Sequence, residues 1–78
     1  MTINQLGNAL SDMYHNAPKG EAVAMIHLFG IKYANEIKQS KFNKKEIART
    51  GNIPESFATE ISKGMKLAKY VSFKQNVL

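Results

Sequence analysis

The stretch IARTGNIPESFATEISKG, residues 47–64, decides the fold of this chain. Ile47 and Ala48 begin one apolar helical face, and Ala58 and Ile61 form an i, i+3 pair on a second. Only a short interruption separates the two patterns. Two short helices joined by a tight turn form a helix-turn-helix, so the stretch predicts this motif.

Local signals mark the limits of the two predicted helices. The Asn43 side chain can cap the amide of Glu46 while the Glu46 carboxylate reaches back. Gly51-Asn52 favours a helix end, because both residues tolerate left-handed backbone. Pro54 suits the first turn of the next helix. We therefore expect a helix-turn-helix at approximately residues 43–64, closed by the buried side chains of Ile53, Ala58 and Ile61.

The remaining sequence is also helical in pattern. A first helix begins after Thr2, which forms a capping box with Gln5, and ends at residues 16–18. A long second helix is expected from about residue 19 to 38, and Gly30 within it indicates a close helix–helix crossing. The chain is therefore expected to be all-α: a single domain over residues 1–78, built as a compact bundle of four helices.

Positive charge is concentrated in the half of the chain that contains the motif. Residues 1–36 carry two basic and three acidic side chains, whereas residues 37–78 carry nine basic and three acidic ones. The two halves thus have net charges of −1 and +6, which add to the +5 of the whole chain. Such an asymmetry is typical of a phosphate-binding face, although a solvated lysine-rich surface would have the same composition.

Composition and spacing argue against several other classes. Cysteine is absent, so disulfides and thiolate metal sites are excluded. No apolar run is long enough for a membrane span and no secretion signal opens the chain, which predicts a soluble, cytoplasmic protein. Neither His15 nor His27 is followed by a carboxylate or histidine three or four residues on. We expect no metal, no cofactor and no enzymatic activity.

The motif resembles the helix-turn-helix of the Cro and phage-repressor (XRE-like) superfamily, whose pattern is close to L-A-x-x-x-G-[VI]-[ST]-x-x-x-[IV]-[ST]-x-[ILW]-[EQ]-x-G. The matching positions are Ile47, Ala48, Ile53, Ala58, Thr59, Ile61 and Gly64, with no gap. Three positions depart from the pattern. Asn52 replaces the turn glycine, Pro54 replaces the hydroxyl cap, and Ala58 is smaller than the usual residue.

The resemblance implies double-stranded DNA as the partner and assigns residues to it. Its second helix would lie in the major groove, with base-facing positions at Glu55, Ser56, Thr59, Glu60 and Lys63. The start of its first helix would meet phosphate through Asn43, Lys44 and Lys45. Lys66 and Lys69 lie beyond the closing glycine, within reach of the flanking backbone. The implied role is that of a small sequence-specific transcriptional regulator.

The two glutamates leave a second function open. A groove-facing carboxylate is repelled by phosphates unless it accepts from a cytosine amino group. Alternatively, Glu55 stabilises a helix N-terminus, and Glu60 pairs with Lys63 or Lys66. A motif of this kind would also suit a helical protein-interaction module, such as a small inhibitor or an accessory subunit of a DNA-acting complex.

The C-terminal residues 69–78 are too apolar for a disordered end. They contain Tyr70, Val71, Phe73, Val77 and Leu78. This segment is expected either to pack back onto the first helices or to form a contact in a homodimer, since regulators of this kind usually bind two half-sites as dimers.

Overall fold

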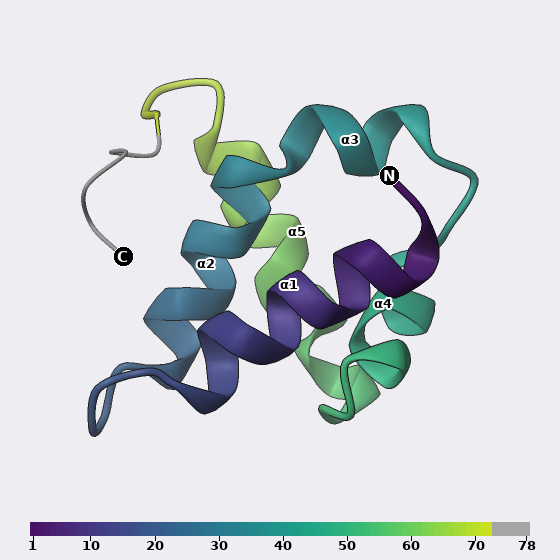
Figure 1. Cartoon of the computed structure of the whole chain (residues 1–78). Helices are drawn as coiled ribbons and strands as arrows, with labels where there is room; N and C mark the ends of the chain where they lie inside the picture. Colours follow the sequence, from purple (N-terminus) through teal and green to yellow (C-terminus); the bar gives the residue numbers. More distant parts are fainter. Residues whose placement is uncertain (73–78) are drawn as a thin grey trace.

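Helices and their connections make up all of the described part of the chain, residues 1–72, in the computed structural model (Figure 1). The elements are α1 (Ile3–His15), α2 (Ala22–Lys32), α3 (Ala34–Gln39), α4 (Lys44–Thr50), the short 3-10 helix η1 (Glu55–Phe57) and α5 (Ala58–Leu67). The predicted all-α class is confirmed. In Figure 1, α5 lies behind α1 and beside α2. In the same view α3 lies across the top, and α4 lies on the side away from α2.

Two capping boxes set helix starts where the sequence predicted them. The Gln5 backbone amide donates to the Thr2 side-chain oxygen at 3.1 Å. The Thr2 backbone amide donates to the Gln5 side-chain oxygen at 2.8 Å. Asn43 and Glu46 make the same reciprocal pair at the start of α4, at 2.8 and 3.3 Å. Each box satisfies amides that have no partner inside the helix, so the first turn is stable locally.

The prediction of one helix over residues 19–38 was wrong in two respects. Gly20 has a φ of 83° and lies in a turn, and Glu21 has φ −115° and ψ 14° at the N-cap position, so α2 begins at Ala22. At the other end, Tyr33 has φ −109° and ψ 19°, outside the helical range, which divides the segment into α2 and α3. The bend changes the chain direction, and Ala34 and Ile37 on α3 are both buried.

One apolar core joins all five α-helices. Its largest fully buried side chains are those of Leu6, Leu10, Ile26, Phe29, Ile47 and Ile61. Ile53, from the connection between α4 and η1, is also buried, as predicted. Ala58 is only half-buried at the start of α5. Its neighbour Phe57 packs against Tyr14 of α1, with ring centroids 5.7 Å apart.

The predicted close crossing at Gly30 is confirmed: Gly30 of α2 meets Gly64 of α5. A Cβ atom at Gly30 would lie 2.6 Å from the Ile61 carbonyl oxygen and 2.9 Å from the Gly64 Cα. A Cβ atom at Gly64 would collide with the His27 carbonyl oxygen. The two backbones therefore touch, and α5 is held against α2 at a separation that only glycine permits.

The turn after α4 is a Schellman motif built on asparagine. Asn52 has a φ of 59°, as its place in the predicted helix end requires. The Ile53 amide donates to the Ala48 carbonyl and the Asn52 amide to the Arg49 carbonyl, both at 3.1 Å. Ile53 and Ala48 are both buried, which adds the apolar contact typical of the motif. The turn therefore directs Ile53 into the core.

Pro54 does not open an α-helix directly. Its ψ of 137° is extended, η1 follows it over Glu55–Phe57, and α5 begins at Ala58. The predicted start of the second motif helix was thus too early by about one turn. The Phe57 amide donates to the Pro54 carbonyl, closing the tighter i, i+3 turn that often precedes an α-helix.

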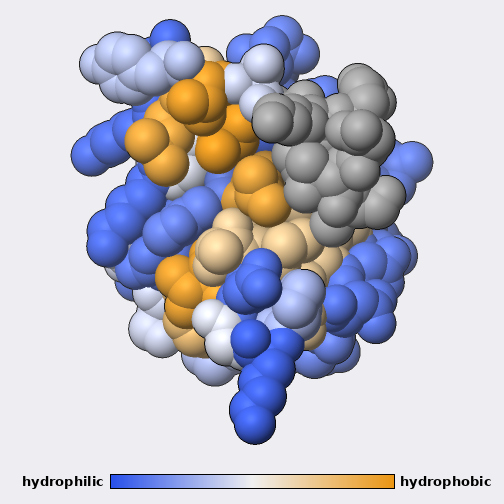
Figure 2. Space-filling view, turned by 90° about the vertical axis from the view of Figure 1, so that its left-hand side faces the viewer, coloured by the Kyte–Doolittle hydropathy of each residue, from blue (hydrophilic) through white to orange (hydrophobic). Residues whose placement is uncertain are grey.

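Several apolar side chains remain exposed on the side of the molecule formed by α2 and the end of α5. Val23, Leu67 and Val71 are each between 42 and 49% exposed, and Tyr70 is 82% exposed. Figure 2 shows hydrophobic patches on this side, separated by hydrophilic residues. Tyr70 and Val71 thus do not pack into the core. Phe73, Val77 and Leu78 of the apolar C-terminal segment lie outside the described residues.

Candidate nucleic-acid interface

The outward face of the second motif helix carries three of the predicted base-facing residues. Ile61, Gly64 and Met65 turn inward and fix the rotation of α5. Thr59 and Lys63 are exposed and four residues apart, so they lie on one outer face. Ser56 is exposed on η1 just before them. These three polar side chains form a short surface that a groove could receive.

The start of α4 carries the predicted phosphate contacts. Lys45 is exposed and Lys44 is half-buried. The Asn43 side-chain oxygen already accepts from the Glu46 amide, so its observed role is to cap the helix. The basic contribution of this helix start therefore comes from the two lysines.

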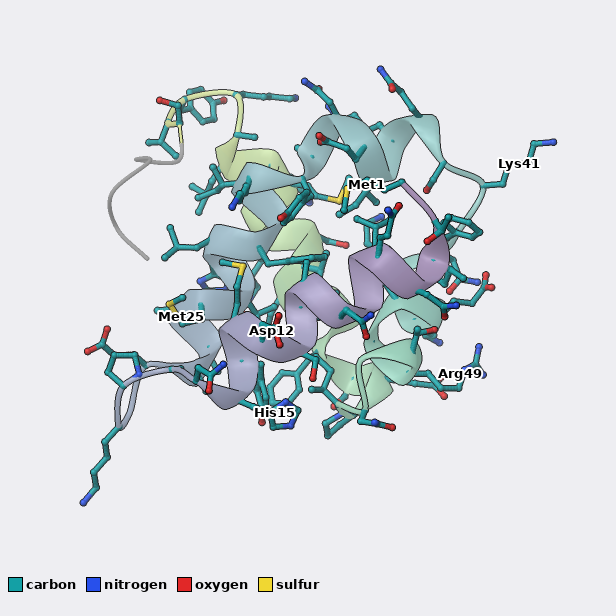
Figure 3. All side chains as sticks on the ribbon, viewed as in Figure 1. Met1, Asp12, His15, Met25, Lys41 and Arg49 are labelled. Carbon is teal, nitrogen blue, oxygen red and sulfur yellow. The ribbon has the colours of Figure 1, made fainter. Side chains whose placement is uncertain are left out.

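Glu55 and Glu60, the two acids among the predicted base-facing residues, are each paired with a cation. Glu55 lies 3.6 Å from Arg49 in an exposed ion pair that joins η1 to α4. Arg49, which extends outward from α4 in Figure 3, was not among the residues predicted for the interface. An exposed pair contributes little to folding, but it does offset the Glu55 charge near the outer face of α5.

Glu60 is held more firmly. One carboxylate oxygen lies 2.7 Å from His27 Nε2 on α2, and the other accepts from Lys63 Nζ at 3.3 Å. The Glu60 side chain is 21% exposed, so it lies along the seam between α2 and α5. Pairing with Lys63 was one of the expected alternatives. His27 was not predicted as a partner, because its carboxylate comes from a residue 33 positions away.

These bonds change the acidity of Glu60. The hydrogen bond from His27 is the main cause that lowers the pKa of this carboxyl, and Lys63 lowers it further, whereas burial acts in the opposite direction. Glu60 is therefore ionised at neutral pH, and its carboxylate oxygens are hydrogen-bonded to His27 and Lys63.

Comparison with family models supports the motif as a whole. The model described as HTH-like domain matches residues 2–74, which is nearly the entire chain. The chain belongs to the HTH-like domain family. Searches of curated proteins and of solved structures found no match.

Lys66 and Lys69 of this HTH-like domain lie with other cations around a surface hollow. The hollow has a volume of about 380 Å³ and is lined by Lys38, Lys44, Ser62, Met65, Lys66 and Lys69. Lys38 comes from α3, and sequence reasoning missed it because nothing in the local pattern places α3 beside α5. Charge clustering along the chain was the available signal, since four lysines fall in residues 38–45.

Within residues 1–72, no group of three or more histidine, aspartate or glutamate side chains is arranged to hold a metal ion. No helix in this part of the chain has the length and apolar character needed to cross a membrane.

The Glu60 contacts predict a pH dependence of stability. Because the pKa of Glu60 is lowered on folding, its stabilising contribution is present above the pKa of the unfolded chain. That contribution should be lost as pH falls from neutral to below the ordinary glutamate pKa of about 4.3. Urea denaturation over this range should show a smaller acid-induced loss of stability for Glu60→Gln than for the wild type.

Glu55→Gln is the control, since the ion pair of Glu55 with Arg49 is exposed. Equal acid-induced losses in Glu60→Gln and the wild type would contradict the role of the His27 contact.

Proposed function

We propose that this HTH-like domain is a small DNA-binding protein, a sequence-specific transcriptional regulator of the Cro and phage-repressor kind. In this proposal α5 lies in the major groove, with Ser56 and Thr59 toward the base edges and Lys63 toward guanine or phosphate. Lys44, Lys45 and Lys66 contact the flanking backbone. The role is binding without catalysis, in the cytoplasm.

The observation that carries this proposal is the exposed polar face of α5 beside lysines without acidic partners. Three ion pairs join side chains within residues 1–72, and they involve His27, Arg49 and Lys63. Lys44, Lys45 and Lys66 take part in none of them. The acids that would repel DNA, Glu55 and Glu60, are in contrast both paired. The charges left to act on a polyanion next to α5 are thus mainly positive.

A salt titration tests the proposal. Affinity for duplex DNA should fall with salt at a log–log slope of about −0.9 per phosphate neutralised. The double variant Lys44→Ala with Lys45→Ala should lower the magnitude of this slope by about 1.8, and should weaken binding about 10- to 100-fold near 0.1 M salt. The loss should be alike for random and genomic duplexes, because phosphate contacts carry no sequence information. Fluorescence anisotropy with labelled duplexes provides the measurement.

The matched control removes the same charge elsewhere. Lys19 and Lys32 are exposed and lie outside the motif, so the variant Lys19→Ala with Lys32→Ala has the same net charge as the test variant. It should lose much less affinity. If both double variants bind equally weakly, net charge alone explains the binding. If neither loses affinity, α4 does not contact phosphate.

A protein-interaction module is the second candidate function. It is favoured by the exposed apolar side chains of Val23, Leu67, Tyr70 and Val71, which a second copy in a homodimer or another protein would cover. Under this alternative, the titration should detect no saturable binding to any duplex. Under the main proposal, the same surface is available for the dimer that two half-sites require.

A further inference from the structure

The lysine hollow is built from three separate helices and the residues after α5. Lys38 comes from α3, Lys44 from the start of α4, and Lys66 and Lys69 from the end of α5 and the turn beyond it. Ser62 and Met65 of α5 complete the lining. Lys38, Lys66 and Lys69 are exposed, whereas Met65 is only 9% exposed and belongs to the core. The hollow therefore combines a buried apolar side chain with exposed cationic ones.

Among the described residues, no acidic side chain lines the hollow beside these lysines. Glutamate and aspartate are absent from the lining, and none of its four lysines belongs to the three ion pairs found within residues 1–72. Lys63 on the same helix differs, because its ammonium group is bonded to Glu60. Four ammonium groups around one depression repel each other, and a bound anion would remove that repulsion.

The lining suits phosphate in particular. Ammonium groups bind phosphate as mobile point charges with several donors each, and the Ser62 hydroxyl can donate one further hydrogen bond. The volume of about 380 Å³ lies near the lower end of the range for small-molecule sites, about 300–1,000 Å³. It therefore exceeds the needs of a single small ion and suits a group that carries more than one phosphate.

We propose that this hollow is a binding site for linked phosphate groups, with Lys38, Lys44, Lys66 and Lys69 as the charge partners and Ser62 as a hydroxyl donor. The linked phosphates can come from a free polyphosphate or from consecutive phosphodiesters of a nucleic acid backbone. The site does not require the base-reading face of α5, so it does not rest on the proposed function. Lys38 and Ser62 distinguish it from the phosphate contacts considered above, whereas Lys44, Lys66 and Lys69 are common to both.

The test uses inorganic tripolyphosphate and the full chain. As tripolyphosphate is added, the amide chemical shifts in proton–nitrogen NMR spectra should change until they reach a plateau. The largest changes should occur at Lys44, Ser62 and Lys66. The variant Lys38→Gln with Lys69→Gln alters two exposed side chains outside the core and should weaken binding about tenfold or more. Its control is Lys19→Gln with Lys41→Gln, which removes equal charge from exposed positions outside the hollow and should bind as the wild type. Figure 3 shows Lys41 pointing away from the body of the molecule.

Each outcome decides the matter. Shifts that never saturate, or an equal loss in both double variants, would overturn the site in favour of general charge attraction. Saturable binding lost only in the Lys38 and Lys69 variant would support it. Addition of duplex DNA then identifies the source: displacement of tripolyphosphate assigns the hollow to the DNA backbone, and simultaneous binding assigns it to a free polyphosphate. Tripolyphosphate binding without any DNA binding would support the site and overturn the proposed function.

Discussion

Replacement of Ile61 by alanine should cost about 2–5 kcal/mol of folding free energy. Ile61 is the largest fully buried side chain of α5. Its truncation removes apolar contacts and leaves a cavity, because the neighbouring helices can close the space only in part. A domain of this size has a stability of only about 5–15 kcal/mol, so much of it would be lost.

Thermal or urea denaturation followed by circular dichroism measures this effect. Thr59→Ala is the control on the same helix, because Thr59 is exposed and should change stability by no more than about 0.5 kcal/mol. A nearly unchanged stability in Ile61→Ala would mean that α5 is rotated, with another face toward the core. The assignment of Ser56, Thr59 and Lys63 to the outer face would then fail as well.

Gly64→Ala should destabilise the domain by about 1–3 kcal/mol, even though alanine is the better helix former by about 0.8–1 kcal/mol. The added Cβ would collide with the His27 carbonyl oxygen and lie 3.0 Å from the Gly30 Cα. Both are backbone atoms, so α2 and α5 would have to separate. The 2.7 Å contact between His27 and Glu60 lies beside this crossing and should lengthen with it.

Two measurements separate this account from a general effect of substitution on α5. Lys66→Ala, at an exposed position two residues further on, should change stability little. Gly30→Ala meets the same contact from the other helix, so the effects of the two glycine substitutions should be less than additive in the double variant. Full additivity, or a gain in stability from Gly64→Ala, would contradict a backbone contact at this crossing.

Local signals were sufficient to predict both limits of α1 and of α4. The capping boxes at Thr2 and Asn43 act within four residues, and Asn52 needs only its own backbone preference to end α4. The position of Gly64 matched a family pattern, and a close crossing was inferred from Gly30, although the sequence did not show that the two meet. The start of α5 was predicted about one turn too early, because Pro54 permits either a helical or an extended ψ.

The sequence by itself therefore determined the helical class, the helix-turn-helix and the inward side chains Ile53 and Ile61, because capping and apolar periodicity are properties of neighbouring residues. Only the tertiary structure decided the bend at Tyr33, the contact between His27 and Glu60, and the convergence of Lys38 with Lys44, Lys66 and Lys69. These features join residues far apart in the chain. Their distances depend on how closely α2 and α5 cross and on where α3 turns, and no local pattern encodes either quantity.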